Sequence, residues 1–149
     1  MMEEIPIFKF ALRKDLQDKL EYLPTRFDEL SSGWDVRAAI SNQLVIKQSE
    51  YIKIPLGFKV LCPSGYSLEI RAKYTVYNKN LNSLFGTIHE SSKDELIFAA
   101  QYLPYSPGWT MDVDDLIINP GDLIAKIVPV KRQEMIIESI SEEEFNSLK

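Results

Sequence analysis

Apolar and polar residues alternate with a period of two in several short stretches of the chain, which is the spacing expected of half-buried β-strands. Near the N-terminus, Phe8, Phe10 and Leu12 occupy alternate positions. In a later stretch the alternation places Ala72 on the apolar face and Arg71 on the polar face. The pattern predicts strands over residues 8–12, 44–46, 51–56 and 67–72.

Further strands are expected from other local patterns. Residues 96–100 are apolar throughout, as in a strand that is covered on both faces. Asn119, Pro120 and Gly121 suit a type II turn, with Pro at the second position and Gly at the third. This turn leads into a predicted strand over 123–130, and a last strand is predicted over 135–140.

Helical features are sparse. A short helix is expected at 141–148, where Ser141 can cap the N-terminus and Glu144 can complete a capping box. The charged stretch 14–29 is expected to be irregular, with one helical turn near 16–20. Many short strands separated by turns, without strand–helix alternation, predict an all-β barrel or sandwich.

The stretch 102–115 is predicted to be a long loop rich in Pro, Gly and aromatic residues. Tyr102, Tyr105 and Trp109 lie in it. Exposed aromatic side chains on a rigid loop suit a protein contact. The alternative is that these rings fill the mouth of the barrel or a seam between subunits.

Composition limits the classes of site that the chain can carry. With 149 residues, a single domain spanning 1–149 is expected. Cys62 and His89 are the one cysteine and the one histidine. They cannot form an intrachain disulfide or supply the ligands of a structural zinc site, so no protein metal site is predicted.

Charge and hydropathy narrow the choice of partners. The formal charge of −5 argues against direct, non-specific binding of nucleic acid, although a nucleotide pocket needs only a few local cations. No apolar run approaches the roughly 18 residues needed to span a bilayer, and residues 1–10 lack the features of a signal peptide. A soluble, cytoplasmic protein is expected, in the host cytoplasm if a phage encodes it.

Several short segments carry a resemblance to a known family. Residues 33–39 are similar to the motif Gly-x-Asp-Leu-Arg-Ala, and 120–125 to Pro-Gly-Asp-Arg-Ile-Ala. Residues 86–88 open a segment like Gly-Val-Ile-Asp, and 55–58 and 63–66 resemble the stretch before a further motif. In this order the segments resemble the trimeric dUTPases, and in particular their phage-type branch.

The resemblance implies a fold and an activity. The expected fold is an all-β, dUTPase-like distorted jelly roll or β-barrel with a short C-terminal helix, assembled as a homotrimer with pockets at the subunit interfaces. In this family a water molecule attacks the α-phosphorus of dUTP, with magnesium on the triphosphate, to give dUMP and pyrophosphate. This reaction requires a base, a cation and phosphate-binding donors.

The phosphate-binding positions differ from the family pattern. If Gly86 anchors a gapless match, the arginine of the second motif falls on Ala72, and its serines fall on Lys73 and Tyr74. In the fourth motif the glutamine position carries Lys126. A one-residue slip would recover Arg71 but would turn the strand over.

The cationic residues suggest an alternative anion site. Arg71, Lys73, Lys79 and Lys126 could together bind the phosphates of a deoxynucleotide. The alternative is that they form an ordinary solvated face.

The catalytic positions differ as well. Asp35 matches the family's pocket carboxylate, although such an Asp can also bond local backbone amides. His89 occupies the position of the catalytic carboxylate, and Ser92 that of the aromatic residue under the deoxyribose. His89 could act as a general base near neutral pH, or it could bond a neighbour such as Glu90. The Gly-rich C-terminal arm of the family is not recognised before residue 149.

These departures lead to competing functional hypotheses. The first is a pseudoenzyme: a dUTPase-fold trimer that has lost hydrolysis and serves as a binding or structural protein, for instance in a virion or another larger assembly. The second is an active, divergent dUTP diphosphatase with magnesium bound to its substrate. The third is a sensor that binds nucleotide without turnover.

Overall fold

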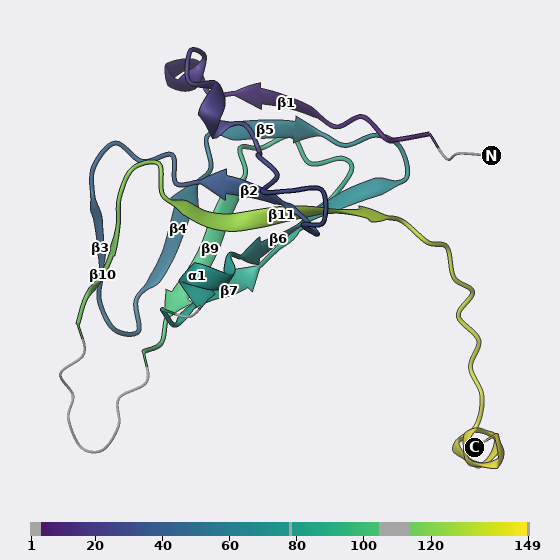
Figure 1. The fold of residues 1–149 in the computed structure, drawn as a ribbon. Coiled ribbons are helices and arrows are strands. Elements are labelled where there is room, and N and C mark those ends of the chain that lie inside the picture. The colour runs from purple at the N-terminus through teal and green to yellow at the C-terminus, as the bar shows by residue number, and fades with distance from the viewer. Residues whose placement is uncertain (1–3, 78, 105–113, 149) are drawn as a thin grey trace, which may run out of the picture.

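The computed structural model describes residues 4–77, 79–104 and 114–148, and within them the regular secondary structure consists mainly of short antiparallel strands. Figure 1 shows the strands folded around one another, with both termini leaving this body. The strands are β1 (Lys9–Leu12), β2 (Trp34–Arg37), β3 (Leu44–Ile46), β4 (Tyr51–Pro55), β5 (Phe58–Leu61), β6 (Tyr66–Ala72), β7 (Leu81–Phe85), β8 (Thr87–Ile88), β9 (Ile97–Tyr102), β10 (Leu116–Ile118) and β11 (Leu123–Lys131). The all-β prediction is confirmed.

The strands pair in separate small sheets. The order is β2-β11-β6-β8 in one sheet and β4-β9-β7 in another, and β1 pairs with β5 and β10 with β3. The helices are short: α1 (Tyr74–Tyr77), α2 (Glu142–Ser147) and 3-10 turns at Lys14–Leu16 and Leu20–Tyr22. The 3-10 turns occupy the stretch in which one helical turn was predicted.

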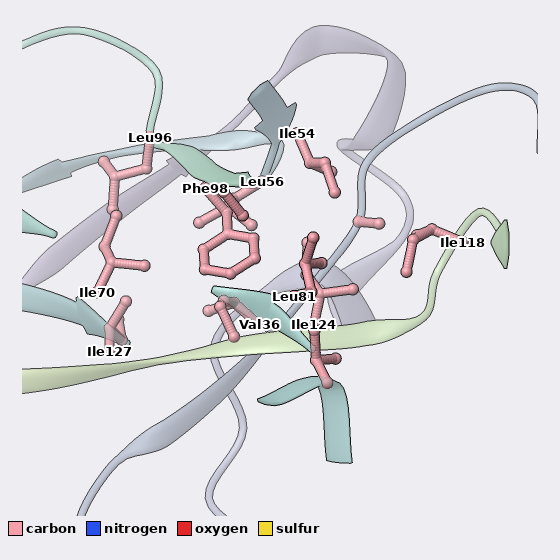
Figure 2. Close-up of a cluster of buried hydrophobic side chains, with 14 of the residues drawn as sticks. Val36, Ile54, Leu56, Ile70, Leu81, Leu96, Phe98, Ile118, Ile124 and Ile127 are labelled. Atoms are coloured by element: carbon pink, nitrogen blue, oxygen red, sulfur yellow. The ribbon is translucent and has the colours of Figure 1, made fainter. Parts of the chain in front are cut away.

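The core is a cluster of apolar side chains contributed by most of the strands. Figure 2 shows Phe98 at the centre of this cluster, close to Leu56 and Val36. All three side chains are fully buried. Burying a large apolar side chain stabilises a fold by roughly 1.5–3 kcal/mol, so this cluster is the main source of stability.

The alternation of apolar residues is confirmed where it was predicted. Leu68 and Ile70 in β6 are buried, whereas Arg71 is exposed. The predicted turn before β11 is also confirmed, because the Asp122 backbone N–H donates to the Asn119 carbonyl at 3.1 Å. Gly121, at the third position of this turn, has a φ of +83°, which favours glycine.

Some predicted boundaries were wrong. Residues 135–140 do not form a strand, and Ile136 is 94% exposed there. A segment forms a strand only when its backbone pairs with a neighbouring strand. This segment leaves the body of its own chain, where it has no such neighbour (Figure 1). Ile97, the first residue of β9, is 43% exposed, so β9 is covered on both faces only further along.

The predicted loop 102–115 begins later than expected. Tyr102 is the last residue of β9, is 7% exposed, and donates from its hydroxyl to the Asp114 carbonyl at 2.8 Å. It is therefore part of the core rather than an exposed loop aromatic. Tyr105 and Trp109 lie outside the described residues.

The C-terminal helix forms where it was predicted. Ser141 caps α2 by accepting a hydrogen bond from the Glu144 backbone N–H at 3.1 Å. This helix lies at the far end of the segment that leaves the body in Figure 1.

Candidate functional site

Neighbouring strands bring together three charged residues that are far apart in the sequence. In Figure 1, β11 runs between β2 and β6. In the β2–β11 ladder, Lys126 lies opposite Asp35. Ala72, at the end of β6, lies opposite Ala125, so the next residue, Lys73, follows directly beside β11.

The carboxylate of Asp35 is the centre of this group. Its Oδ2 lies 2.9 Å from Nζ of Lys73, and the side chains of Lys73 and Asp35 are 24% and 13% exposed. Nζ of Lys126 lies 3.5 Å from the Ser32 hydroxyl. These residues surround a hollow of about 270 Å³. Its lining includes Asp35, Lys73, Lys126, Ser32 and Ser31.

The backbone also holds Asp35 and Lys73 in place. The Asp35 N–H donates to the Thr25 carbonyl at 2.6 Å, and the Thr25 N–H donates back to the Asp35 carbonyl at 3.0 Å. The Lys73 N–H donates to the Ile124 carbonyl at 3.1 Å. The charged side chains therefore project from a fixed backbone, which reduces the entropy lost on ligand binding.

The charges in this hollow favour an anion. Lys73 and Lys126 carry two positive charges against the single negative charge of Asp35. Lys73 is engaged with Asp35, whereas Lys126 contacts only a neutral hydroxyl in the described hydrogen bonds. Ammonium groups and hydroxyl donors are the groups that hold phosphate oxygens.

The structure places Arg71 away from this hollow. Its Nη2 lies 2.5 Å from Oε2 of Glu69, and its side chain is 54% exposed. Arg71 is the direct cross-strand neighbour of Lys126, but its guanidinium is turned along β6 to Glu69, two residues earlier in the same strand. Lys79 is also exposed and does not line the hollow.

His89 lies in a different hollow, of about 700 Å³, lined also by Tyr66 and Ser91. The neighbouring Glu90 accepts hydrogen bonds from Nη1 of Arg132 at 2.8 Å and from the Gly65 N–H at 3.1 Å. These contacts fasten the loop after β8 to the point where the chain leaves β11. Burial, together with the charge of Glu90, raises the pKa of the Cys62 thiol.

Ser92 lines a third hollow, of about 290 Å³, together with Tyr51, Ile88 and Glu95. One chain therefore brings Asp35, Lys73 and Lys126 together. It places His89 and Ser92 in separate hollows of the loop between β8 and β9. Two residues that line the first hollow, Ser31 and Ser32, were not among the site residues predicted from the sequence.

Carboxylate and imidazole side chains are not clustered for metal binding in the described residues. Residues 4–77, 79–104 and 114–148 contain no group of three or more His, Cys, Asp or Glu side chains that could hold a metal ion. Mg²⁺ is commonly bound through one or two carboxylates together with substrate phosphates. The donors around Asp35 therefore fit magnesium that arrives bound to a triphosphate.

No helix within the described part of the chain is long and apolar enough to cross a membrane.

The relation to known proteins comes from direct comparison, since no family model matches the sequence. The deoxyuridine 5'-triphosphate nucleotidohydrolase of Aquifex aeolicus is 32% identical over 118 residues, which cover 76% of this chain and 73% of that enzyme. The chain belongs to the dUTPase family. The resemblance found in the sequence motifs is thereby confirmed.

Other dUTPases match over different lengths. The enzyme of Neorickettsia sennetsu is 28% identical over 146 residues, covering 95% of this chain and 89% of the enzyme. The enzyme of Fusobacterium nucleatum is 34% identical over 77 residues, so the match spans only 53% of that relative.

Solved structures support the fold of this dUTPase-family chain. The dUTPase of the Staphylococcus aureus phage phi11 matches with a TM-score of 0.72 at 19% identity, covering 91% of this chain and 97% of that one. The dUTPase of the staphylococcal phage 80alpha matches with a TM-score of 0.74 at 17% identity, again covering 91% of this chain and 97% of that one. The dUTPase-like jelly-roll fold is confirmed.

Proposed function

We propose that this chain binds dUTP and hydrolyses it to dUMP and pyrophosphate. The observation that carries the proposal is the hollow in which Lys73 contacts Asp35 at 2.9 Å and Lys126 adds a second cation. The family relationship identifies dUTP as the substrate to test. We further propose that residues 1–149 act as one domain, because one apolar cluster extends from Val36 to Ile127.

In the proposed reaction, Lys73 and Lys126 hold the phosphate oxygens, and magnesium enters as part of the substrate. His89 from another copy accepts a proton from the attacking water. The water oxygen then bonds to the α-phosphorus, the bond from that phosphorus to the bridging oxygen breaks, and pyrophosphate leaves. Lys126 and Lys73 neutralise the charge that develops.

This mechanism requires more than one copy of the chain, because His89 and Asp35 line different hollows of the same chain. A homotrimer, as the family implies, would supply His89 from one copy and Asp35 from another. The exposed segment after β11 supports self-association: Met135, Ile136 and Ile137 are 78%, 94% and 84% exposed. Apolar side chains of this kind are usually covered in an assembly.

A second candidate is nucleotide binding without turnover. A specific observation favours it: the position of the family's catalytic carboxylate carries His89. An imidazole can accept a proton, but it cannot supply the negative charge of a carboxylate to position magnesium-bound water. Loss of a well-placed base typically costs about 10²- to 10⁴-fold in rate.

The test is pyrophosphate release from dUTP in the presence of Mg²⁺, measured for the wild type and for His89→Ala. The proposal expects clear turnover in the wild type and a fall of about 10²-fold or more in the variant. The exposed Lys59→Ala serves as a matched surface control, and Lys126→Ala should raise KM. Calorimetric binding of dUTP without pyrophosphate release would support the second candidate. Absence of both binding and turnover would refute both.

A further inference from the structure

Three hydrogen bonds join Gly65, Glu90 and Arg132 in a closed network. Oε2 of Glu90 accepts one bond from Nη1 of Arg132 at 2.8 Å and another from the Gly65 N–H at 3.1 Å. The Arg132 N–H donates to the Gly65 carbonyl at 2.7 Å, which closes the circle. We call these three residues the Glu90 network. Each member is bonded to both others, so displacement of any one breaks two of the three bonds.

Two members of the network belong to well-fixed parts of the backbone. Gly65 is the third residue of a turn that is closed by a bond from the Tyr66 N–H to the Pro63 carbonyl at 3.1 Å. Its φ of +85° suits that position of a type II turn. Arg132 directly follows β11, at the end of the ladder between β6 and β11. The network therefore ties Glu90 to the end of a long strand pair.

His89, the residue before Glu90, has little support from its own strand. β8 is two residues long and lies at the edge of its sheet, beside β6. Just beyond β8, the His89 carbonyl accepts a bond from the Ser92 N–H at 3.0 Å, which closes a turn within the loop itself. Segments with few backbone hydrogen bonds to the rest of a fold open most readily. The contacts of Glu90 are therefore a main attachment of this loop to the body of the protein.

The Glu90 network also borders the space that His89 faces. Glu90 and Arg132 line the hollow of His89, together with Tyr66 and Ser67. The side chains of Arg132 and Glu90 are 57% and 32% exposed. An ion pair as exposed as this one contributes little to global stability. Its effect is expected on the local position of the loop instead.

We propose that Glu90 and Arg132 are positioning residues for His89. Through the Glu90 network they hold the loop after β8 in the place where the imidazole can accept a proton from the attacking water. The inference rests on the proposed function and adds the residues that place its base. All members of the network belong to the same copy of the chain as that histidine, so the arrangement needs no second subunit.

The test uses two variants that remove charges of opposite sign from one network. Glu90→Gln removes a negative charge and Arg132→Gln a positive one, so a direct effect of charge on the reaction would change kcat in opposite directions. Loss of a shared contact acts in the same direction. Both variants should lower kcat for dUTP with Mg²⁺ by about 10- to 100-fold, the cost of a misplaced catalytic group. KM should change little, because the phosphate-binding lysines are untouched.

A double variant and a conservative variant sharpen the test. Glu90→Gln combined with Arg132→Gln should lower kcat no further than either change alone, because each change breaks the same network. Arg132→Lys should retain much of the wild-type kcat, since an ammonium can still pair with Glu90.

Glu95→Gln is the matched control. The Glu95 side chain is 30% exposed and pairs with Arg13 at 3.1 Å, but it lines the hollow of Ser92 instead of that of His89. It should leave kcat and KM unchanged. Circular dichroism and solution mass are measured for every variant, so that unfolding or dissociation of the assembly can be recognised.

A second measurement follows the loop without turnover. His89 is the one histidine of the chain, so the imidazole signals of histidine-labelled protein in NMR spectra report on this loop alone. These signals should move in Glu90→Gln and in Arg132→Gln, and should stay in place in Glu95→Gln.

The outcomes are distinct. If the wild type turns over dUTP while both variants keep its kcat and its imidazole signals, the inference fails and the proposed function stands. A fall in Glu90→Gln alone would make Glu90 a directly acting group, and opposite changes in the two variants would make the effect one of charge; either result overturns the inference. Dissociation of the assembly in the variants would also overturn it. If the wild type releases no pyrophosphate, the proposed function fails and the positioning role fails with it.

Discussion

Replacing Gly86 with Ala should destabilise the fold by a steric mechanism. Gly86 lies between β7 and β8, against the backbone of β6. A Cβ at this position would collide with the carbonyl oxygen of Ile70 and lie 3.3 Å from its carbonyl carbon. The Ile70 N–H also donates to the Gly86 carbonyl. Because the obstacle is backbone rather than a flexible side chain, β6 or the residue-86 segment must move.

The size of the effect follows from these contacts. Overpacking that shifts the backbone costs about 1–3 kcal/mol, and weakening of the hydrogen bond to Ile70 adds about 1 kcal/mol. We therefore expect Gly86→Ala to lower the free energy of unfolding by about 2–4 kcal/mol. At about 2–4 °C per kcal/mol for a chain near this size, Tm should fall by about 5–15 °C.

The assay is thermal and guanidinium unfolding followed by circular dichroism at one fixed protein concentration, because self-association would shift Tm. Gly65→Ala is the matched control: its φ is +85°, but nothing lies within 4 Å of the added Cβ. That variant should lose only the roughly 1–2 kcal/mol of left-handed strain. If Gly86→Ala is no more destabilising than Gly65→Ala, the steric reasoning is wrong.

The remaining predictions concern protonation and assembly. Because the pKa of the Cys62 thiol is raised above its usual 9.0, chiefly by burial, the folded state keeps this proton longer than the unfolded state. Stability should therefore fall as pH rises above about 9, and this fall should be smaller in Cys62→Ala, as denaturant titrations at several pH values would show. The pKa of Asp15 is lowered chiefly by its hydrogen bond with Arg13, so the stability from this contact is present at neutral pH and is lost as pH falls through the lowered pKa. Asp15→Asn should reduce the acid sensitivity of unfolding below about pH 4, and an unchanged acid profile would contradict this prediction. Replacing Ile136 and Ile137 with Glu should lower the solution mass measured by light scattering without unfolding the body, because both are exposed outside it; an unchanged mass would show that this segment does not hold the assembly together.

Local sequence was sufficient to predict the elements whose residues satisfy their own geometry. The turn at Gly121 and the cap at Ser141 formed as predicted, because both depend on residues within a few positions. The alternation that exposes Arg71 was correct for the same reason. The strand predicted over 135–140 was wrong because an extended apolar segment becomes a strand only when a partner is available.

The candidate site could be predicted only in part. The sequence identified Asp35 by itself and grouped Lys73 and Lys126 with Arg71 and Lys79 in one possible anion patch. The contact between Lys73 and Asp35 depends on how β11 pairs with β2 and β6, which joins residues distant along the chain.

The sequence by itself determined the period of the strands, the positions of the turns, the acidic net charge and the family motifs. These properties reside in single residues or their immediate neighbours. Only the tertiary structure decided that Lys73 reaches Asp35 and that His89 lies in a separate hollow. The physical reason is that strand pairing and side-chain packing are set by long-range contacts whose partners no local pattern specifies.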